Sequence, residues 1–226
     1  MYSKEYYEEI FGDWIQVVDT ESLAPILKYL QTTSIPYTPF SHLVFRAFWE
    51  CNYSKLRVVI VGQDPYPQEG VAQGIAFANN PSVNAGLWSP SLQVIENTLQ
   101  GDDLPFHSFD SMLIDWCKQG ILLLNSALTT EVNNIGSHTM LWRPFISKLL
   151  DNLAKQKPNV IFVLLGSQAQ SFAPYIAKHG CTIVKAPHPA YYVRLGQTYY
   201  PDNENPFLKI DNIIKERGEQ PIIWAE

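Results

Sequence analysis

VVIVGQDPYPQEGVAQGIAF, residues Val58–Phe77, joins an uninterrupted apolar run to a loop rich in Gly and Pro. The apolar run predicts a fully buried strand. Asp64 and Tyr66 leave the end of this strand, and Phe77 follows on the same loop. Ligands of open parallel α/β sheets bind at the carboxyl ends of the strands. The stretch therefore predicts a binding loop, although Asp64-Pro65 is also typical of an ordinary turn.

Length and composition favour one globular unit. The chain has 226 residues, of which 46% are hydrophobic, and we expect a single domain over residues 1–226, with residues 1–35 as a helical N-terminal extension of it. No apolar run reaches the roughly 18 to 20 residues that a membrane span needs, and the N-terminus lacks the pattern of a signal peptide. We therefore expect no membrane association and a cytoplasmic location.

Cysteine usage and charge narrow the class of protein further. Cys51, Cys117 and Cys181 are odd in number, far apart and without C-x-x-C spacing, which argues against a disulfide framework and a zinc site and fits a reducing compartment. The net charge of -6 argues against a protein that coats long stretches of phosphate. It is compatible with a binder of small footprint that uses hydroxyls, backbone N–H groups and helix N-termini.

Strand and helix patterns alternate along the chain. Leucine and isoleucine at helical spacing (Leu23, Ile26, Leu27 and Leu30) make the first 35 residues mostly helical, and Ser41–Trp49 predicts a short helix. Four apolar runs predict strands: Leu56–Val61, Ile121–Leu124, Val160–Leu165 and Thr182–Lys185. Helical patterns lie between them: Ser91–Leu99, Met112–Lys118, Trp142–Leu153 and Gln168–Ala177. This order predicts an α/β fold, a three-layer α/β/α sandwich with a central four-stranded, largely parallel sheet.

Such a sheet would bring distant residues to one edge. The carboxyl ends of parallel strands share a rim, so the residues that follow the four strands should converge on one crevice. They are Asp64 and Tyr66 after the first strand, Asn125 after the second, Gly166-Ser167 after the third and His188 after the fourth. This convergence is stronger evidence for a site than any single motif.

The motifs on these loops resemble those of uracil-DNA glycosylases of the family 1 type. The resemblance runs from about Pro39 to Trp224, in the order and spacing that the family shows. It is carried by Gly62–Tyr66, Gly74–Phe77, Ser89–Leu92, Gly120–Asn125, Ser137-His138, Gly166–Gln170 and His188-Pro189. The family breaks the bond between uracil and deoxyribose in DNA, and enzymes that act there must flip the nucleotide out of the stack.

The resemblance implies a role for each pocket residue. Phe77 would supply the face on which the base lies. The Asn125 amide would donate to O4 and accept from N3–H of uracil, and cytosine presents the reverse polarity at both positions. Tyr66 would wall off the 5-position and so exclude thymine.

The chemistry would fall to Asp64 and His188. By resemblance, the Asp64 carboxylate stabilises the oxocarbenium-like sugar and positions water, and His188 donates a hydrogen bond to O2 of the base as a neutral imidazole. Backbone amides around Gln63 and Asp64 would share that load. No metal and no organic cofactor is implied.

This chain departs from the family's pattern at residues that are expected to contact DNA. Ser91 and Ser167 lie where the family grips phosphates, although both also lie at expected helix starts and could act as caps. After His188-Pro189 the family commonly has Ser-Pro-Leu-Ser, whereas this chain has Ala190–Leu195. Tyr192 replaces the leucine that wedges into the stack and is the wedge candidate, with Tyr191 and Leu195 behind it. Arg194 could restore phosphate attraction.

A second departure is Pro67, which stands where the family usually has histidine. Both departures affect the DNA grip and leave the pocket intact. We therefore expect excision of uracil with altered affinity for duplex or a preference for single strands.

Three functions remain open from the sequence. The first is a monofunctional glycosylase that acts on uracil in single- or double-stranded DNA and leaves an abasic site. The second is a relative that acts on another damaged base, and the presence of Asn125 and Tyr66 argues against this reading. The third is a DNA-binding accessory or scaffold protein with reduced or lost turnover. The altered loop after His188-Pro189 suggests this reading, and the presence of Asp64, Asn125 and His188 together argues against it. We expect a monomer, and a protein inhibitor of glycosylases could bind its DNA face.

Overall fold

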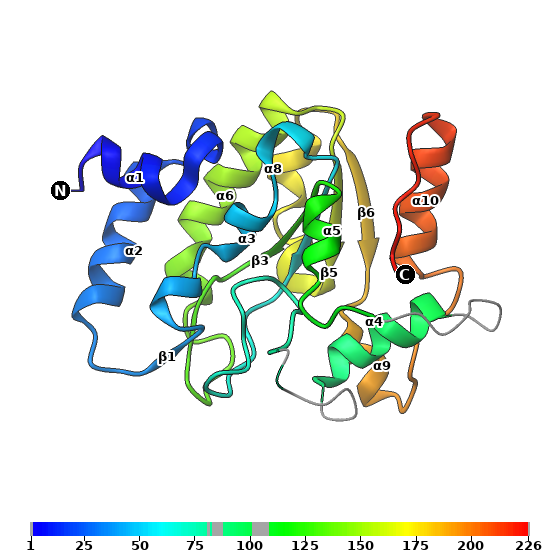
Figure 1. The fold of residues 1–226 in the computed structure, drawn as a ribbon, viewed down its shortest axis with the longest axis horizontal. Helices are drawn as coiled ribbons and strands as arrows, with labels where there is room; N and C mark the ends of the chain where they lie inside the picture. Colours follow the sequence, from blue (N-terminus) through cyan, green and yellow to red (C-terminus); the bar gives the residue numbers. More distant parts are fainter. Residues whose placement is uncertain (1, 81, 83–87, 101–108, 226) are drawn as a thin grey trace.

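The computed structural model describes residues 2–80, 82, 88–100 and 109–225. Its centre is a sheet in the order β3-β2-β5-β6, in which all neighbouring strands run parallel (Figure 1). Its strands are β2 (Val58–Gly62), β3 (Ile121–Asn125), β5 (Ile161–Leu165) and β6 (Thr182–Ala186). A separate antiparallel pair joins β1 (Tyr37–Thr38) to β4 (Thr130–Glu131).

The apolar runs form the strands because helices cover the sheet. Every residue of the central strands β2 and β5 is buried, as expected of parallel strands with both faces covered. The edge strand β6 carries the exposed Lys185. The predicted four-stranded parallel sheet is confirmed. β2 begins two residues later than predicted, because Tyr53–Lys55 form a 3-10 turn that leads into Leu56.

Helices flank the sheet (Figure 1). They are α1 (Lys4–Phe11), α2 (Thr20–Thr32), α3 (Arg46–Glu50), α4 (Pro90–Gln100), α5 (Ile114–Lys118), α6 (Thr139–Gln156), α7 (Gly166–Gln170), α8 (Ala173–Ala177), α9 (Pro189–Arg194) and α10 (Pro206–Glu216). The long α6 packs on α2 and α8, while α5 and α10 pack against the two edge strands β3 and β6. α4 packs on α9, so two helices from distant parts of the chain lie side by side next to the strand ends.

Two predicted helices are divided in the structure. The pattern at Ser41–Trp49 forms a 3-10 turn at Ser41–Leu43 and then α3, because the Ala47 N–H donates to the Gly74 carbonyl at 3.2 Å instead of continuing the helix back to Leu43. The pattern at Gln168–Ala177 forms α7 and α8. Pro174 lies in the first turn of α8, where its missing N–H is tolerated. In the middle of one continuous helix the same proline would clash with the preceding turn, so the pattern divides there.

The N-terminal region is helical as predicted and packs into the same hydrophobic core as the sheet. The predicted apolar stripe on α2 is buried. The Trp14 indole donates to the Cys51 carbonyl at 2.8 Å, and the Asn152 amide of α6 donates to the Val17 carbonyl at 3.0 Å. These bonds join the N-terminal region to the segment that follows α3 and to helix α6.

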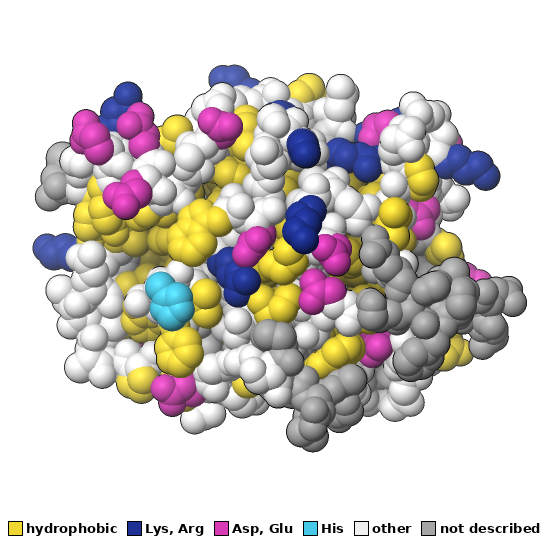
Figure 2. All heavy atoms as spheres, viewed as in Figure 1, with side chains coloured by type: hydrophobic (Ala, Val, Ile, Leu, Met, Phe, Trp, Pro, Cys, Tyr) yellow, Lys and Arg dark blue, Asp and Glu magenta, His cyan; other side chains and the backbone are white. Residues whose placement is uncertain are grey.

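On the face drawn in Figure 2, basic and acidic side chains of the described residues lie interspersed among polar and apolar ones. None of the described helices is long and apolar enough to cross a membrane. All three cysteines are buried and unpaired.

Candidate active site

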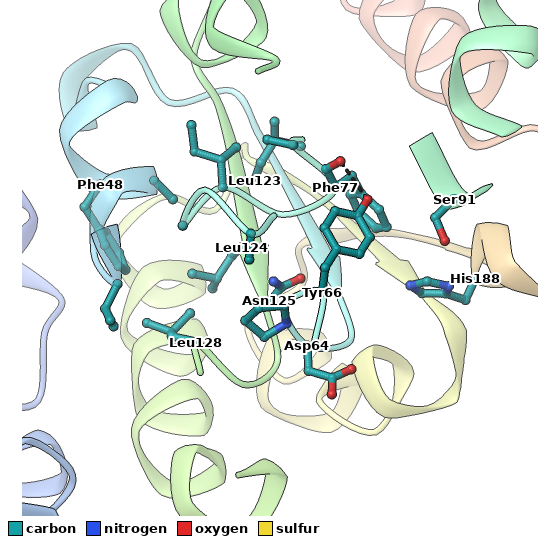
Figure 3. Close-up of a pocket in the computed structure, with 17 residues that line it drawn as sticks. Phe48, Asp64, Tyr66, Phe77, Ser91, Leu123, Leu124, Asn125, Leu128 and His188 are labelled. Carbon is teal, nitrogen blue, oxygen red and sulfur yellow. Dashed lines mark hydrogen bonds between the residues drawn. The ribbon is translucent and has the colours of Figure 1, made fainter. Parts of the chain in front are cut away.

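One pocket opens at the carboxyl ends of the parallel strands (Figure 3). Of the residues expected to converge at the strand ends, Asp64, Tyr66, Asn125 and His188 line this pocket, whereas Gly166 and Ser167 line an adjacent groove. Phe77 and Ser91, for which the resemblance implied roles, line the pocket as well. Leu123, Leu124 and Leu128 add an apolar wall. Gln63 lines the adjacent groove instead of this pocket. The pocket therefore combines an aromatic face, one side-chain amide, a carboxyl group and an imidazole.

Gly62, at the end of β2, allows the base of the pocket to form. It pairs in register with Asn125 on β3. A Cβ atom at Gly62 would lie 2.8 Å from Asn125 Oδ1 and 2.9 Å from Phe77 Cζ, closer than real contacts allow. The absence of a side chain at Gly62 thus lets the amide and the ring approach each other.

Phe77 adopts an unusual backbone conformation in the pocket. Its φ is 68°, in the left-handed region that phenylalanine rarely adopts, and such outliers cluster at functional sites. The Tyr66 hydroxyl donates to the Phe77 carbonyl at 2.8 Å, which fixes both residues (Figure 3). No group in the described part of the chain forms a hydrogen bond with the Asn125 side-chain amide. The rigid ring and the unbonded amide are therefore both available to a ligand in the pocket.

Asp64 is held by a backbone amide from another loop. The N–H of Gly136, in the turn between β4 and α6, donates to Asp64 Oδ2 at 2.6 Å. Burial raises the pKa of the Asp64 carboxyl, and the bond from Gly136 and the Gln63 side chain oppose that rise. The carboxylate is therefore oriented by a backbone N–H, which cannot change rotamer as a side-chain donor can.

His188 is the N-cap of α9, and this role decides which of its nitrogens carries the proton. The Ala190 N–H donates to His188 Nδ1 at 3.2 Å, so Nδ1 is the acceptor and Nε2 carries the hydrogen of the neutral ring. Burial and then the charge of Arg194 lower the pKa of His188 to about 4. The ring is therefore a neutral donor at pH 7.

Gly166 fixes the position of His188. A Cβ atom at Gly166 would lie 2.9 Å from His188 Cβ, and its φ of +86° also favours glycine. The His188 ring lies 5.6 Å from the Phe77 ring, centroid to centroid. Strand ends β5 and β6 thus place the imidazole next to the aromatic face.

A wider groove adjoins the pocket and shares Asp64, Tyr66, Ser91 and His188 with it. Among the residues predicted to contact DNA, Ser167, Tyr191 and Arg194 line this groove. Lys185 lies there too, and none of the ion pairs in the described part of the chain involves Lys185 or Arg194. Two cations without an ion pair among the described residues therefore face the groove.

The prediction that Tyr192 wedges into DNA is wrong. Its side chain is only 1% exposed, its ring lies 4.6 Å from that of Tyr200, and its hydroxyl donates to Glu204. α9 packs this residue toward α4 and the core, whereas Tyr191 is 42% exposed and lines the groove. Leu195 is also exposed, at 55%.

At the start of α4, the capping role that was open for Ser91 belongs to Ser89. The Ser89 hydroxyl accepts a hydrogen bond from the Leu92 N–H at 3.4 Å and so caps α4. Ser91 lies inside the helix, is buried and lines the pocket. Ser167 lies in the first turn of α7, where no side chain caps the helix.

The sequence analysis missed Gly136 as a contributor to the site. Gly136 acts through its backbone N–H, so it carries no side chain whose chemistry could identify it. The available signal was position, because Gly136 stands directly before Ser137-His138. Gly166 was expected at the rim, and the structure adds that its missing side chain leaves room for His188.

The sequence matches one family model and many named relatives. Residues 48–214 match the model described as the Uracil DNA glycosylase superfamily. A protein of Xanthomonas euvesicatoria named uracil-DNA glycosylase is 33% identical over 223 residues, which cover 95% of this chain and 87% of that protein. One of Escherichia fergusonii with the same name is 34% identical and is covered at 93% on both sides.

Solved structures show the same fold. The mimivirus uracil-DNA glycosylase matches with a TM-score of 0.72 at 24% identity, over 97% of this chain and 92% of that one. Its Y322F variant in complex with UGI matches with a TM-score of 0.75 at 24% identity, over 99% and 89%. The extent of the family match and the identity to relatives of similar length lead to one conclusion: this chain belongs to the uracil-DNA glycosylase superfamily.

Proposed function

We propose that the pocket receives a uracil base flipped out of DNA and that its residues hydrolyse the N-glycosidic bond, leaving an abasic site. The family match and the identity to proteins named uracil-DNA glycosylase make the chain a hydrolase of DNA repair. The observation that carries the residue-level proposal is the pocket itself, where Asp64, Asn125 and His188 lie at the ends of three strands beside the Phe77 ring.

Base recognition rests on shape and on one amide. The Phe77 ring offers a flat face for stacking, and the Asn125 amide, unbonded within the described part of the chain, supplies one donor and one acceptor to the edge of the base. Uracil matches that pair of groups, and cytosine would leave both unpaired. The Tyr66 ring, tied to the Phe77 carbonyl, forms a stiff wall against a 5-methyl group.

Bond cleavage rests on His188, which stabilises developing negative charge, and on Asp64, which stabilises developing positive charge. The neutral His188 donates from Nε2 to O2 of uracil as negative charge develops there, and its low pKa leaves the ring with a single proton, on Nε2, at pH 7. Asp64, oriented by Gly136, places its carboxylate where the sugar becomes cationic and where water attacks.

DNA is held in the groove by few groups. Ser91 and Ser167 contact phosphates, Arg194 attracts them, and the exposed Tyr191 enters the stack in place of Tyr192. Ala190 has no hydroxyl for a phosphate contact and Pro67 has no imidazole, so we expect single-stranded substrate to be favoured. Equal excision rates on single strands and duplex over a range of salt would contradict this preference.

Excision is tested with an oligonucleotide that contains one uracil. Alkali after incubation reveals abasic sites as strand breaks, and Asn125→Ala and Asp64→Asn should each abolish most of the breaks. Unchanged cleavage by either variant would overturn the site assignment. DNA binding by the wild type without cleavage would favour the accessory or scaffold role. Cleavage of control oligonucleotides that contain hypoxanthine, or thymine in place of uracil, would favour a broader substrate.

The groove is also the proposed docking site for a protein inhibitor. Two mimivirus variants of the same fold are solved in complex with UGI. We expect UGI to inhibit this chain by covering the groove, and Tyr191→Ala to weaken the inhibition. Undiminished excision in excess UGI would rule this partner out.

We further propose that residues 1–226 form one domain and act as a monomer in the cytoplasm. One buried cluster runs from Tyr7 to Ile222, and the buried thiols have raised pKa values, about 12 for Cys51, which suits unpaired structural cysteines. A single thermal transition and a monomer mass in sedimentation would fit this proposal, and two transitions or a dimer would contradict it. Recovery of the protein in a membrane or periplasmic fraction would contradict the location.

A further inference from the structure

Tyr200 contacts the backbone directly before His188. Its hydroxyl donates to the carbonyl oxygen of Pro187 at 2.9 Å, across 13 positions of sequence. This is the only hydrogen bond that the Pro187 carbonyl accepts from the described residues. Because the peptide unit is planar, a fixed Pro187 carbonyl also fixes the orientation of the His188 N–H and Cα. Tyr200 therefore acts on the chain at the point from which the imidazole projects.

Tyr200 is itself held rigidly. Its side chain is 2% exposed, and its ring packs edge-on against Tyr192 of α9 at 4.6 Å. Its backbone N–H donates to Thr98 Oγ1 at 2.9 Å, and that hydroxyl donates to the Val94 carbonyl at 2.6 Å. Both partners lie on α4, the helix that also contributes Ser91 to the pocket. The hydroxyl is therefore placed by α4 and α9 together.

The other side of His188 is closed. Gly166 leaves little room for movement toward β5, since even a Cβ atom there would lie 2.9 Å from His188 Cβ. The carbonyl of Ala186, one residue earlier than Pro187, accepts from the Gln170 amide at 2.9 Å. Two successive carbonyls before the histidine are thus held by side chains from two different parts of the chain.

The hydroxyl is suited to this task chemically. Burial raises the pKa of Tyr200 well above its ordinary value, so the group stays protonated and remains a donor. The bond is partly buried, and a carbonyl that loses its donor in such a place is costly to leave unpaired. The peptide therefore has a reason to rotate toward another partner when the hydroxyl is removed.

We propose that Tyr200 is a positioning residue for His188: its hydroxyl, through the Pro187 carbonyl, directs Nε2–H of the imidazole toward the base. The proposal rests on the role of His188 in the proposed function. Tyr200 touches neither the base nor the reacting bond. Displacement of the imidazole by a fraction of an ångström should weaken a hydrogen bond that matters most as the bond breaks.

Tyr200→Phe is the direct test, because it removes the hydroxyl and keeps the ring packing. We expect the single-turnover excision rate at saturating enzyme to fall about tenfold, while the Kd for uracil-containing DNA stays unchanged. A misaligned donor should cost less than the roughly 100-fold or more that removal of such a donor costs. Tyr53→Phe is the matched control. Tyr53 is also buried, and its hydroxyl donates to Gln156, remote from the pocket. This control should keep the wild-type rate.

A double-mutant cycle separates positioning from a general loss of structure. In a His188→Ala background the Tyr200→Phe change should have no further effect on the rate, because its only route to the chemistry is gone. The same tenfold loss in that background would overturn the proposal. A wild-type rate for Tyr200→Phe would also overturn it. If His188→Ala alone left the rate unchanged, the proposed function of His188 would fail instead, so the two failures are distinguishable.

Discussion

Gly62 shows how little space the pocket leaves around its side chains. We expect Gly62→Ala to push the Asn125 amide or the Phe77 ring out of place, since the new methyl group would lie within 3 Å of both. Overpacking of this kind costs roughly 1 to 3 kcal/mol of stability, and a misplacement of the order of 1 Å can cost on the order of 100-fold in rate. Single-turnover excision and thermal unfolding measure the two effects.

Gly180→Ala is the control for Gly62→Ala. Gly180 has a φ of +74°, and a Cβ atom there would meet nothing within 4 Å, so alanine strains the backbone without touching the pocket. It should lower stability and leave excision unchanged. A Gly62→Ala variant with the wild-type rate would show that the close contact of Asn125 and Phe77 is not needed.

His188 also makes stability depend on pH. Its pKa of about 4 in the folded protein lies below the ordinary value of 6.5, so the unfolded chain binds a proton first as pH falls. Stability that is present above pH 6.5 is therefore lost as pH falls toward 4, by about 3 kcal/mol for this one group. His188→Asn keeps a side chain able to cap α9 but cannot titrate.

Urea unfolding of the wild type and of His188→Asn, from pH 4 to pH 8, measures this difference. We expect the wild type to lose stability relative to the variant between pH 6.5 and pH 4, with no change in the difference above that window. Parallel curves would mean that the histidine titrates normally in the folded state.

Helix α9 is the element in which the sequence analysis and the structure differ most. Alignment with the family's loop pointed to Tyr192, but the residue is buried against α4 and Tyr200. We expect Tyr191→Ala to lower excision from duplex DNA about tenfold, as loss of one stacking contact would, and to affect single strands much less. Val193→Ala, on the same helix, is the control, because Val193 is exposed but lies outside the groove. Equal losses on both substrates would argue against a wedge.

The strands were predictable and the backbone contacts were not. Four short apolar runs between turn residues define β2, β3, β5 and β6, and the polar residues that follow them had to share one rim. By contrast, the donors from Gly136 and Tyr200 depend on where separate loops meet, which no local pattern records. The burial of Tyr192 depends on how α9 docks on α4, which is likewise a property of the packed molecule.

At the scale of the whole molecule, the net charge of -6 limits how strongly DNA can be attracted. Among the described residues, Arg194 and Lys185 are the cations that face the groove without an ion pair. Each phosphate neutralised contributes about 0.9 to the slope of log K against log salt on duplex, so we expect a slope of magnitude about 2. Arg194→Gln should reduce it by about 1 and weaken binding on every sequence alike.

Binding isotherms by fluorescence anisotropy at several salt concentrations measure this slope. Lys148→Gln serves as the control, because Lys148 is paired with Asp19 and lies outside the groove. A slope of magnitude about 5 or more would require cationic contacts beyond this groove.

The parallel pairing of Gly62 with Asn125 has one more consequence. Side chains alternate between the two faces of a sheet, so a shift of β3 by one residue would turn the Asn125 amide away from Phe77 and present Leu124 in its place. Under the proposed function, the distinction between uracil and cytosine would then disappear without any change in the residues themselves. The base that we propose this enzyme recognises is thus set by the alignment of two strands, and a single inserted residue in β3 should abolish the selectivity.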